Sequence, residues 1–266
     1  MPPVIHPTAI VSPQAKLHPS VTVAPYAVID GGVTLGAGCV VGPHVYLTGV
    51  TEIGERNIFH AGCVIGDAPQ DLKYKNEPTR LRICHDNVFR EHVTVHRSNK
   101  LAEDTVIGSH NLLMANSHVG HNSQLGDHII IANGALLGGH VTVGDRAFIS
   151  GNCLLHQFVR VGALALMQGG ASISKDLPPY TIARGQNHIS GLNVIGLRRA
   201  GIGAPERLEL KQLYKKIFRS GENFREAIAA AQKEFTSAPA KLLLEFLTTA
   251  KRGVCADTGV GEIDGD

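Results

Sequence analysis

The chain has 266 residues, of which 43% are hydrophobic, 18% charged and 5% aromatic, and its formal net charge is +2. This balance excludes a disordered chain, and 30 glycines without a three-residue period exclude collagen. The first residues lack a signal-peptide pattern, no stretch is apolar enough to span a membrane, and the five cysteines form no C-x-x-C pair. We therefore expect a reduced, cytoplasmic protein without disulfides, zinc ribbon or membrane span.

An apolar residue recurs at every sixth position from Ile5 to Ile173, and only Asp71 and Glu77 break this series of 29 positions. A small or β-branched residue recurs four positions later, and glycine often follows the apolar residue directly. Two inward positions separated by an outward one make a short strand, and glycine suits a corner whose dihedral angles other residues avoid. Three such strands close a triangular coil of about 18 residues. The pattern predicts an all-β left-handed parallel β-helix, shaped as a triangular prism.

The charged stretch from 71 to 80 interrupts the pattern and predicts a loop outside the prism. The polar stretch from 97 to 103 keeps the phase at Leu101 and suggests a second, shorter loop. After Ile173 the pattern ends, and apolar residues at helical spacing between 204 and 252 predict about three helices. We therefore divide the chain into a β-helix over residues 1–180, with its external loop near 71–80, and a linker with a C-terminal α-helical domain over 181–266.

The helical segment is basic, since residues 178–252 contain 13 lysines and arginines against six aspartates and glutamates. Such an excess is typical either of a solvated helical surface or of a docking surface for an acidic partner. No aromatic residues are interleaved with the basic ones in a nucleic-acid-binding motif, so we expect no nucleic acid as partner.

Histidines are frequent, with 14 in the chain. An 18-residue coil predicts two columns of them, His121 with His140 and His156 at one corner, and His92 with His110 and His128 on another face. Neutral imidazoles are common zinc ligands, and a three-histidine metal site occurs in β-helical carbonic anhydrases of the γ class. An imidazole with a pKa of about 6.5 also suits a general base that takes a proton from an attacking hydroxyl.

No cysteine or carboxylate recurs here with the spacing of metal ligands, and a metal site leaves the basic segments unexplained. We therefore favour general-base catalysis and expect neither a metal nor a cofactor. A metal-dependent enzyme similar to the γ-class carbonic anhydrases and a non-enzymatic scaffold of stacked coils are the alternatives.

A series of segments, in order along almost the whole chain, resembles the bacterial UDP-N-acetylglucosamine O-acyltransferases, which use acyl carrier protein and begin lipid A synthesis. The segments are Gln70–Tyr74, Glu77–Arg80, Val95–Arg97, Asn111–Met114 with His118 and His121, Gly139–Val141, His156–Phe158, Asp176 with Pro178–Tyr180, and Gly196–Arg199. Hexapeptide repeats occur in many acyltransferases and are weakly specific. The loop at Asp71–Tyr74, the pair His118 and His121, and the element His156–Phe158 are far more specific.

The resemblance implies transfer of a 3-hydroxyacyl chain from acyl carrier protein to the 3-hydroxyl of UDP-N-acetylglucosamine. It implies that His121 is the general base and that the backbone N–H of Gly139 binds the oxyanion. It also implies a homotrimer. Residues implied around the sugar and phosphates are Asp71, Lys73, His96, His118, His140, His156 and Gln157. Nucleotide contacts across a subunit boundary are implied for Asn193 and Arg199, and acyl-groove positions for Met114 and Gly169.

The sequence departs from the family where Asn122 follows His121, since relatives often carry aspartate there. A carboxamide can orient an imidazole by a hydrogen bond, but it carries no charge to stabilise the imidazolium. A related UDP-glucosamine N-acyltransferase of the same pathway is a further alternative. Such enzymes usually carry a separate N-terminal uridine-binding domain, whereas the repeats of this chain begin at Ile5.

Overall fold

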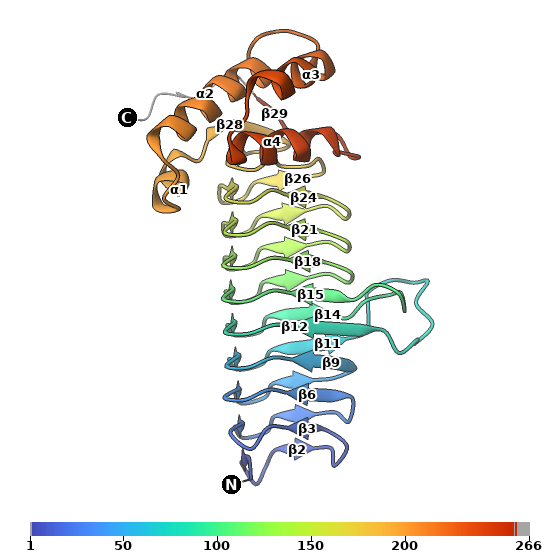
Figure 1. The fold of residues 1–266 in the computed structure, drawn as a ribbon. Helices are drawn as coiled ribbons and strands as arrows, with labels where there is room; N and C mark the ends of the chain where they lie inside the picture. Colours follow the sequence, from blue (N-terminus) through green and yellow to red (C-terminus); the bar gives the residue numbers. More distant parts are fainter. Residues whose placement is uncertain (1, 258, 260–266) are drawn as a thin grey trace.

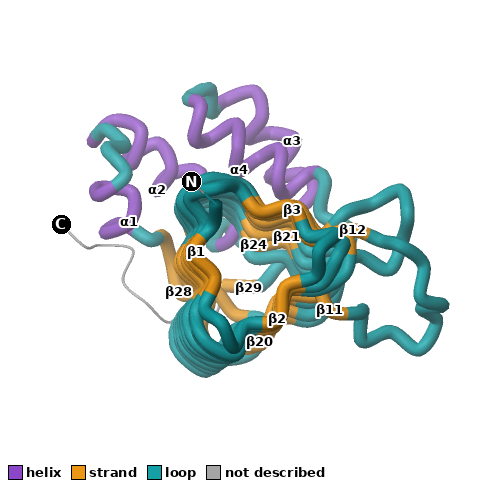
Figure 2. Tube along the Cα trace, turned by 90° about the horizontal axis from the view of Figure 1, so that it is seen from below, coloured by secondary structure: helices purple, strands orange, loops and turns teal. Residues whose placement is uncertain are grey.

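The computed structural model describes residues 2–257 and 259, which form a prism of stacked coils with helices at one end (Figure 1). Each full coil contributes one short parallel strand to each of three sheets, so the prism is triangular when viewed along its axis (Figure 2). Neighbouring strands of a sheet come from successive coils, as where Ile130 pairs with Phe148. These parallel sheets confirm the predicted β-helix.

We name the three sheets A, B and C. Sheet A contains β1 (Val4–Ile5), β4 (Thr22–Val23), β7 (Val40–Val41), β10 (Ile58–Phe59), β13 (Val88–Phe89), β16 (Leu112–Leu113), β19 (Ile130–Ile131), β22 (Phe148–Ile149), β25 (Leu166–Met167), β27 (Thr181–Arg184), β28 (His188–Leu192) and β29 (Ala256–Asp257). Sheet B contains β2 (Ile10–Val11), β5 (Val28–Ile29), β8 (Tyr46–Leu47), β11 (Val64–Asp67), β14 (Thr94–His96), β17 (His118–Val119), β20 (Leu136–Leu137), β23 (Leu154–Leu155) and β26 (Ser172–Ile173). Sheet C contains β3 (Lys16–Leu17), β6 (Val33–Leu35), β9 (Val50–Ile53), β12 (Arg80–Ile83), β15 (Thr105–Ile107), β18 (Gln124–Leu125), β21 (Thr142–Val143) and β24 (Arg160–Val161).

The core follows the prism axis and is built from the residues of the six-residue repeat. From Val23 to Ile173 these apolar residues are at most 4% exposed, except Leu101, which is 60% exposed in a loop. The rings of Phe59 and Phe89 stack in successive coils with centroids 4.8 Å apart. Full burial of one such side chain stabilises the fold by about 1.5–3 kcal/mol, so the repeat is the main source of stability. All five cysteines are unpaired thiols.

The glycines of the repeat have a different role from the predicted one. Most of those that directly follow the apolar residue, such as Gly120, lack a positive φ. A Cβ at Gly120 would lie 2.7 Å from the backbone carbon of Gly138, so glycine is required there for the close approach of successive coils. The left-handed corner positions are taken by glycine in some coils, such as Gly134, and more often by other residues, including Tyr26, Asn122 and His140, with φ between 59° and 60°.

Two loops leave the prism at the corner between sheets B and C, on the same side (Figure 1). The longer loop, residues 68–79, connects β11 with β12, and the shorter loop, residues 97–104, connects β14 with β15. The amide Nδ2 of Asn99 donates to Oδ2 of Asp71 at 2.7 Å, and Nε of Arg97 donates to the hydroxyl of Tyr74 at 3.2 Å. The two loops therefore support each other.

Because of the shorter loop, the predicted column of His92, His110 and His128 is wrong for His92. The loop lengthens its coil, so that Val88 pairs with Leu112, twenty-four residues later rather than eighteen. His110 and His128 stack with centroids 4.8 Å apart, as the predicted column requires. His92, however, lies at the corner between sheets A and B, whereas His110 follows β15 at the corner between sheets C and A.

The chain leaves the last coil through an antiparallel hairpin of β27 and β28, and four helices follow within the described residues. The helices are α1 (Val194–Arg199), α2 (Ala204–Phe218), α3 (Phe224–Glu234) and α4 (Ala238–Thr248). The side chains of Asn223 and Ser237 cap α3 and α4 by accepting from backbone N–H groups. The guanidinium of Arg160 in β24 lies 4.3 Å from the ring of Phe246 and links α4 to the prism. In the part of the chain that the structure describes, no helix has the length and apolar character to cross a membrane.

Candidate active site

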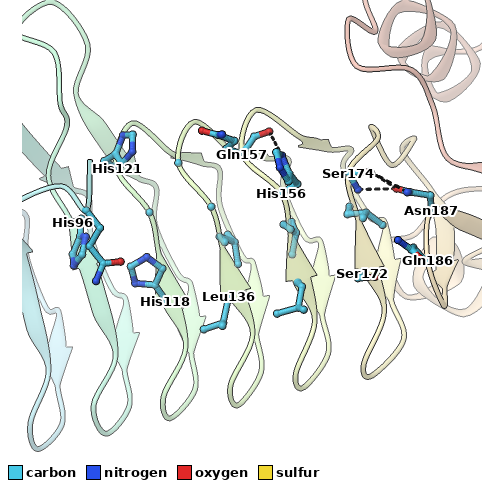
Figure 3. A pocket seen from close by; sticks show the side chains of 18 residues that line it. His96, His118, His121, Leu136, His156, Gln157, Ser172, Ser174, Gln186 and Asn187 are labelled. Carbon is cyan, nitrogen blue, oxygen red and sulfur yellow. Dashed lines mark hydrogen bonds between the residues drawn. The ribbon is translucent and has the colours of Figure 1, made fainter. Parts of the chain in front are cut away.

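A cavity of about 560 Å³ lies on the outer face of sheet B. Its walls come from the outward residues of successive strands and from the corner that follows each strand, so it crosses several coils (Figure 3). The lining includes Gly139 and four histidines, His96, His118, His121 and His156. Gln157 lines it as well, so the fold brings six residues that the sequence singled out to one place.

His121 lies in the turn after β17, and its Nδ1 lies 2.8 Å from Oδ1 of Asn122. The same Oδ1 accepts a hydrogen bond from the backbone N–H of Asn99 at 3.0 Å, which fixes this atom as the amide oxygen. Nδ1 of His121 must therefore carry the proton and donate it to this bond. In the neutral ring, Nε2 is then the unprotonated nitrogen and can accept a proton.

Gly139, in the next coil, faces that nitrogen. A Cβ at position 139 would lie 2.6 Å from Nε2 and 2.7 Å from Cε1 of His121, which is closer than a side chain allows. The backbone N–H of Gly139 donates to no other residue in the described chain. A proton acceptor and an available backbone donor thus lie side by side. Acyl transfer requires these two groups, one for the attacking hydroxyl and one for the developing oxyanion.

His118 and His96 form one wall of the cavity, where His96 is 7% exposed. Their rings meet edge to face with centroids 4.9 Å apart, and Nδ1 of His118 lies 2.8 Å from Oγ1 of Thr94. Burial, with the neighbouring rings of His96 and His121, lowers the pKa of His118 to about 4. Burial also lowers the pKa of His96, whose Nδ1 has no partner among the described residues. Both rings are neutral at pH 7 and can exchange hydrogen bonds with a polar ligand.

His140 borders the cavity without lining it. Its ring lies edge-on to His121 with centroids 5.2 Å apart and stacks on Phe158 at 4.4 Å. Burial, with the neighbouring His121, lowers the pKa of His140. His121, His140 and His156 follow successive strands of sheet B, which confirms the first predicted column. Among the described residues, no three histidine, cysteine, aspartate or glutamate side chains are arranged to hold a metal ion.

The other end of the cavity is polar and lies near the helices. His156 and Gln157 line it, and Nδ1 of His156 lies 3.2 Å from the carbonyl oxygen of Gln157. The guanidinium of Arg252, which follows α4, lies 3.4 Å from the same Nδ1. Asn187, from the β27–β28 hairpin, accepts a hydrogen bond from the backbone of Ser174 at 2.7 Å (Figure 3). Amide donors beside a guanidinium suit an anionic ligand.

Comparison with known proteins decides the family. Residues 176–255 match the family described as UDP N-acetylglucosamine O-acyltransferase, domain 2, and residues 14–49 and 104–139 match the bacterial transferase hexapeptide repeat. The acyl-[acyl-carrier-protein]–UDP-N-acetylglucosamine O-acyltransferase of Syntrophobacter fumaroxidans is 44% identical over 94% of this chain and 98% of its own length. That of Thermodesulfovibrio yellowstonii is 42% identical with the same coverage. The chain belongs to the UDP-N-acetylglucosamine O-acyltransferase family.

Solved structures of this O-acyltransferase family share the fold. LpxA from Acinetobacter baumannii is 39% identical, with a TM-score of 0.91, over 94% of this chain and 99% of its own. A UDP-N-acetylglucosamine acyltransferase from Bacteroides fragilis is 36% identical, with a TM-score of 0.90 and the same coverage. The predicted left-handed winding of the β-helix is confirmed by this likeness.

In this member of the O-acyltransferase family, Asp71 and Lys73 lie on the longer loop and do not line the cavity, although the preceding Gln70 does. The backbone N–H of Lys73 and the amide of Asn99 donate to the carboxylate of Asp71 at 3.0 and 2.7 Å, and both lower the pKa of Asp71. Asp71 is therefore an ionised acceptor on a loop whose first residues reach the cavity.

Asn193 and Arg199 also lie outside the cavity of a single chain. The side chain of Asn193 is used within the chain, because Oδ1 accepts from the N–H of Gly196 and Nδ2 donates to the carbonyl of Leu164. Asn193 thus caps α1 and is only 8% exposed. Arg199, at the other end of α1, is exposed.

Met114 and Gly169 lie at corners between sheets A and B, away from the lining of the cavity. Met114 is half-buried, and Gly169 is exposed. A Cβ at Gly169 would meet only the carbonyl oxygen of Gly151, at 3.6 Å, so the space in front of this residue is open.

Sequence reasoning did not assign several of the lining residues to the site. They include Leu136, Leu154, Ser172, Ser174, Gln186 and Asn187. Leu136 and Leu154 point outward from β20 and β23 and are 44% and 49% exposed. An apolar residue directly before an inward position of the repeat is the signal that could have found them, because neighbouring residues of a strand face opposite ways. Gln186 and Asn187 lie in a hairpin outside the repeat, which carries no such signal.

Proposed function

We propose that the chain transfers a 3-hydroxyacyl group from acyl carrier protein to the 3-hydroxyl of UDP-N-acetylglucosamine, the reaction that begins lipid A biosynthesis. His121 is the general base of this proposal. The observation that carries it is Nε2 of His121, the ring nitrogen that is not bonded to Asn122, beside the available N–H of Gly139 in one cavity. The printed names of the relatives supply the donor and the acceptor. A carrier-protein donor also leads us to place the reaction in the cytoplasm.

The chemical steps follow from these two groups. Nε2 of His121 removes the proton of the 3-hydroxyl as its oxygen attacks the thioester carbonyl carbon, and a C–O bond forms. The carbonyl oxygen becomes an oxyanion and accepts a hydrogen bond from the N–H of Gly139. When the intermediate collapses, the C–S bond breaks and the carrier thiolate leaves. The imidazolium of His121 returns the proton to this sulfur.

The remaining walls suit a nucleotide sugar. The neutral rings of His118 and His96, with His140 beside them, provide hydrogen-bond partners for sugar hydroxyls. His156 and Gln157 lie beside the guanidinium of Arg252, which favours the diphosphate at that end. In this proposal, Asp71 and Lys73 close over the sugar and phosphates from the longer loop.

We propose further that the chain forms a homotrimer through sheet A. The outward residues of this sheet form an almost unbroken apolar row, which consists of Val4, Thr22, Val40, Ile58, Val88, Leu112, Ile130, Phe148 and Leu166. The corresponding row of sheet C is Lys16, Thr34, Glu52, Arg82, Val106, Gln124, Thr142 and Arg160. A continuous apolar face beside a polar one marks an interaction surface, and closed cyclic symmetry bounds the assembly.

Such an assembly would give a role to the predicted site residues that lie outside the cavity of a single chain. Helix α1 follows β28 of sheet A, so a copy that covers the cavity with its sheet A brings its own Arg199 toward the diphosphate end. Asn193 contributes by fixing the start of α1. Met114 and Gly169 then line the acyl groove at the boundary between copies. The exposed Lys215 and its basic neighbours on α2 suit the acidic carrier protein.

Mass spectrometry of the reaction products tests the proposal. The chain is incubated with UDP-N-acetylglucosamine and a panel of 3-hydroxyacyl carrier proteins of different lengths, and the matched 3-amino and UDP-glucosamine acceptors are run in parallel. An O-acylated UDP-N-acetylglucosamine, absent with His121→Ala, supports the assignment. Acylation of an amine alone indicates the related N-acyltransferase reaction. No acyl transfer from any donor contradicts the proposal.

A further inference from the structure

The base is held by a hydrogen-bonded network that comes mainly from the shorter loop, residues 97–104. Asn122, which contacts His121, is 4% exposed and is fixed by several groups. Its backbone N–H donates to Oγ1 of Thr105 at 2.7 Å, and its side-chain Nδ2 donates to Oγ of the fully buried Ser98 at 2.7 Å. The loop therefore decides which amide atom meets the imidazole.

A carboxylate closes this network. Nδ2 of Asn122 also donates to Oε2 of Glu103 at 3.3 Å, and the same Oε2 lies 3.9 Å from Nδ1 of His140. Oε1 of Glu103 pairs with Nζ of Lys100 at 3.0 Å, which lowers the pKa of Glu103 and keeps it ionised. Glu103 is thus the charged group bonded to the residue that contacts the base.

Proton removal by His121 creates an imidazolium, and the amide oxygen beside it carries no full charge. A negative group at the far end of the amide polarises it and favours the charged ring. We propose that Glu103 is a positioning residue: through Asn122 it holds the His121 ring in its reactive orientation and stabilises the protonated ring. This inference rests on the proposed role of His121 as the base.

Several other titratable groups surround His121. They are His96 on β14, His118 on β17, His140 in the next coil, Asp71 on the longer loop, and Glu103 with Lys100 on the shorter loop. The three histidines are held neutral by burial, so they contribute no compensating charge at pH 7. Asp71 acts on His121 through space and bonds to Asn99 and to its own loop, but it makes no direct hydrogen bond to Asn122. Only Glu103, within the described chain, links a carboxylate to the Asn122 amide.

The test separates charge from hydrogen bonding. Glu103→Gln keeps an oxygen that can accept from Asn122 and removes the charge, whereas Glu103→Ala removes both. We expect Glu103→Gln to move the acidic limb of the kcat/KM profile to lower pH by roughly half a unit and to lower kcat by about three- to tenfold, with KM for the sugar nucleotide nearly unchanged. Glu52→Gln, an outward carboxylate of sheet C, is the matched control and should match the native profile.

A charge placed next to the base should make Glu103 unnecessary. Asn122→Asp puts a carboxylate against Nδ1 of His121, and in that background we expect Glu103→Gln to change kcat by less than about twofold. A native pH profile and native kcat for Glu103→Gln in the otherwise unchanged enzyme would overturn the inference. His121→Ala, assayed in parallel, keeps the two proposals apart. If it is inactive while Glu103→Gln is native, only the role of Glu103 fails; if it is active, the proposed base fails as well.

Discussion

The three outer faces of the prism are built on one inward pattern and yet differ in character. In one coil, the strands β19, β20 and β21 each bury their second residue and present their first. The presented residue is Ile130 on sheet A, Leu136 on sheet B and Thr142 on sheet C. Inward residues set the stacking of coils and are nearly interchangeable between sheets. In our proposal, the outward residues give each sheet its own task, namely assembly for sheet A, ligand binding for sheet B and contact with solvent for sheet C.

The largest effect should follow from His121→Ala. This variant tests whether the corner after β17 of sheet B serves the reaction without stabilising the fold. Loss of a general base commonly lowers the rate 10²–10⁴-fold, so kcat/KM should fall by this factor. The fall corresponds to a loss of about 3–5 kcal/mol of transition-state stabilisation. The thermal midpoint should change little, because a corner side chain buries little apolar surface. Val119→Ala, in the adjoining strand, should do the reverse, since Val119 is fully buried. More than a tenth of native kcat in His121→Ala, with His118→Ala inactive, would show that another residue is the base.

A charge introduced on the outer face of sheet A should disrupt assembly, whereas the same charge on sheet C should not. Ile130→Lys places a cation in the apolar row, and an unpaired charge buried at an interface costs about 3–5 kcal/mol. We therefore expect this variant to be monomeric by light scattering and inactive, because the cavity then lacks its second wall. Thr142→Lys, on the sheet C side of the same coil, should remain trimeric and active. An assembled Ile130→Lys variant would place the interface on another face.

Gly139→Ala tests the closeness of two coils on sheet B. The new Cβ would lie 2.6 Å from Nε2 of His121, so the ring must shift. A displacement of this order in a catalytic group can cost on the order of 10²-fold, and we expect the loss in kcat rather than in KM. Gly203→Ala, where the nearest atom to a Cβ lies 3.6 Å away, is the control. A native kcat in Gly139→Ala would mean that this approach is not required for the reaction.

The sequence was sufficient to predict the fold because the six-residue repeat keeps its phase across both loops. Ile58 pairs with Val88, thirty residues later, and Val88 pairs with Leu112, twenty-four later, so both insertions are multiples of six. The longer insertion is marked by the breaks at Asp71 and Glu77, but phase alone could not show that the coil with the shorter loop is six residues longer. Leu101 matches the phase by coincidence and is exposed, and His92 was placed in the wrong column for the same reason.

The candidate site was predictable only in part. Coil arithmetic placed His121 beside His140, because both follow strands in coils of regular length. Ser98 and Glu103, which bond to the Asn122 side chain beside His121, come from the shorter loop, whose path is set by tertiary hydrogen bonds rather than by a period. The roles of the lining residues came from the family resemblance, since the repeat encodes stacking and not chemistry.

The smallest expected effect is on the free energy of unfolding, and it comes from His118 on the outer face of sheet B. The pKa of His118 is lowered to about 4 by burial and by its neighbours His96 and His121, against about 6.5 in an unfolded chain. Above pH 6.5 both states are neutral and the histidine has no effect. Between pH 6.5 and pH 4 the unfolded chain binds a proton that the folded chain does not, so the free energy of unfolding falls as the pH falls.

We expect a loss of about 1–3 kcal/mol across this window, since one pKa unit is 1.36 kcal/mol and His96 shares the same wall. The measurement is urea unfolding at pH 7.5, 5.5 and 4.5, at one protein concentration because assembly contributes to stability. His118→Gln should flatten the dependence between pH 6.5 and 4. His188→Gln, an exposed histidine of β28, should leave it nearly unchanged because that side chain meets water in both states. An equal slope in His118→Gln and the native protein would mean that burial does not lower the pKa of His118 in the folded protein.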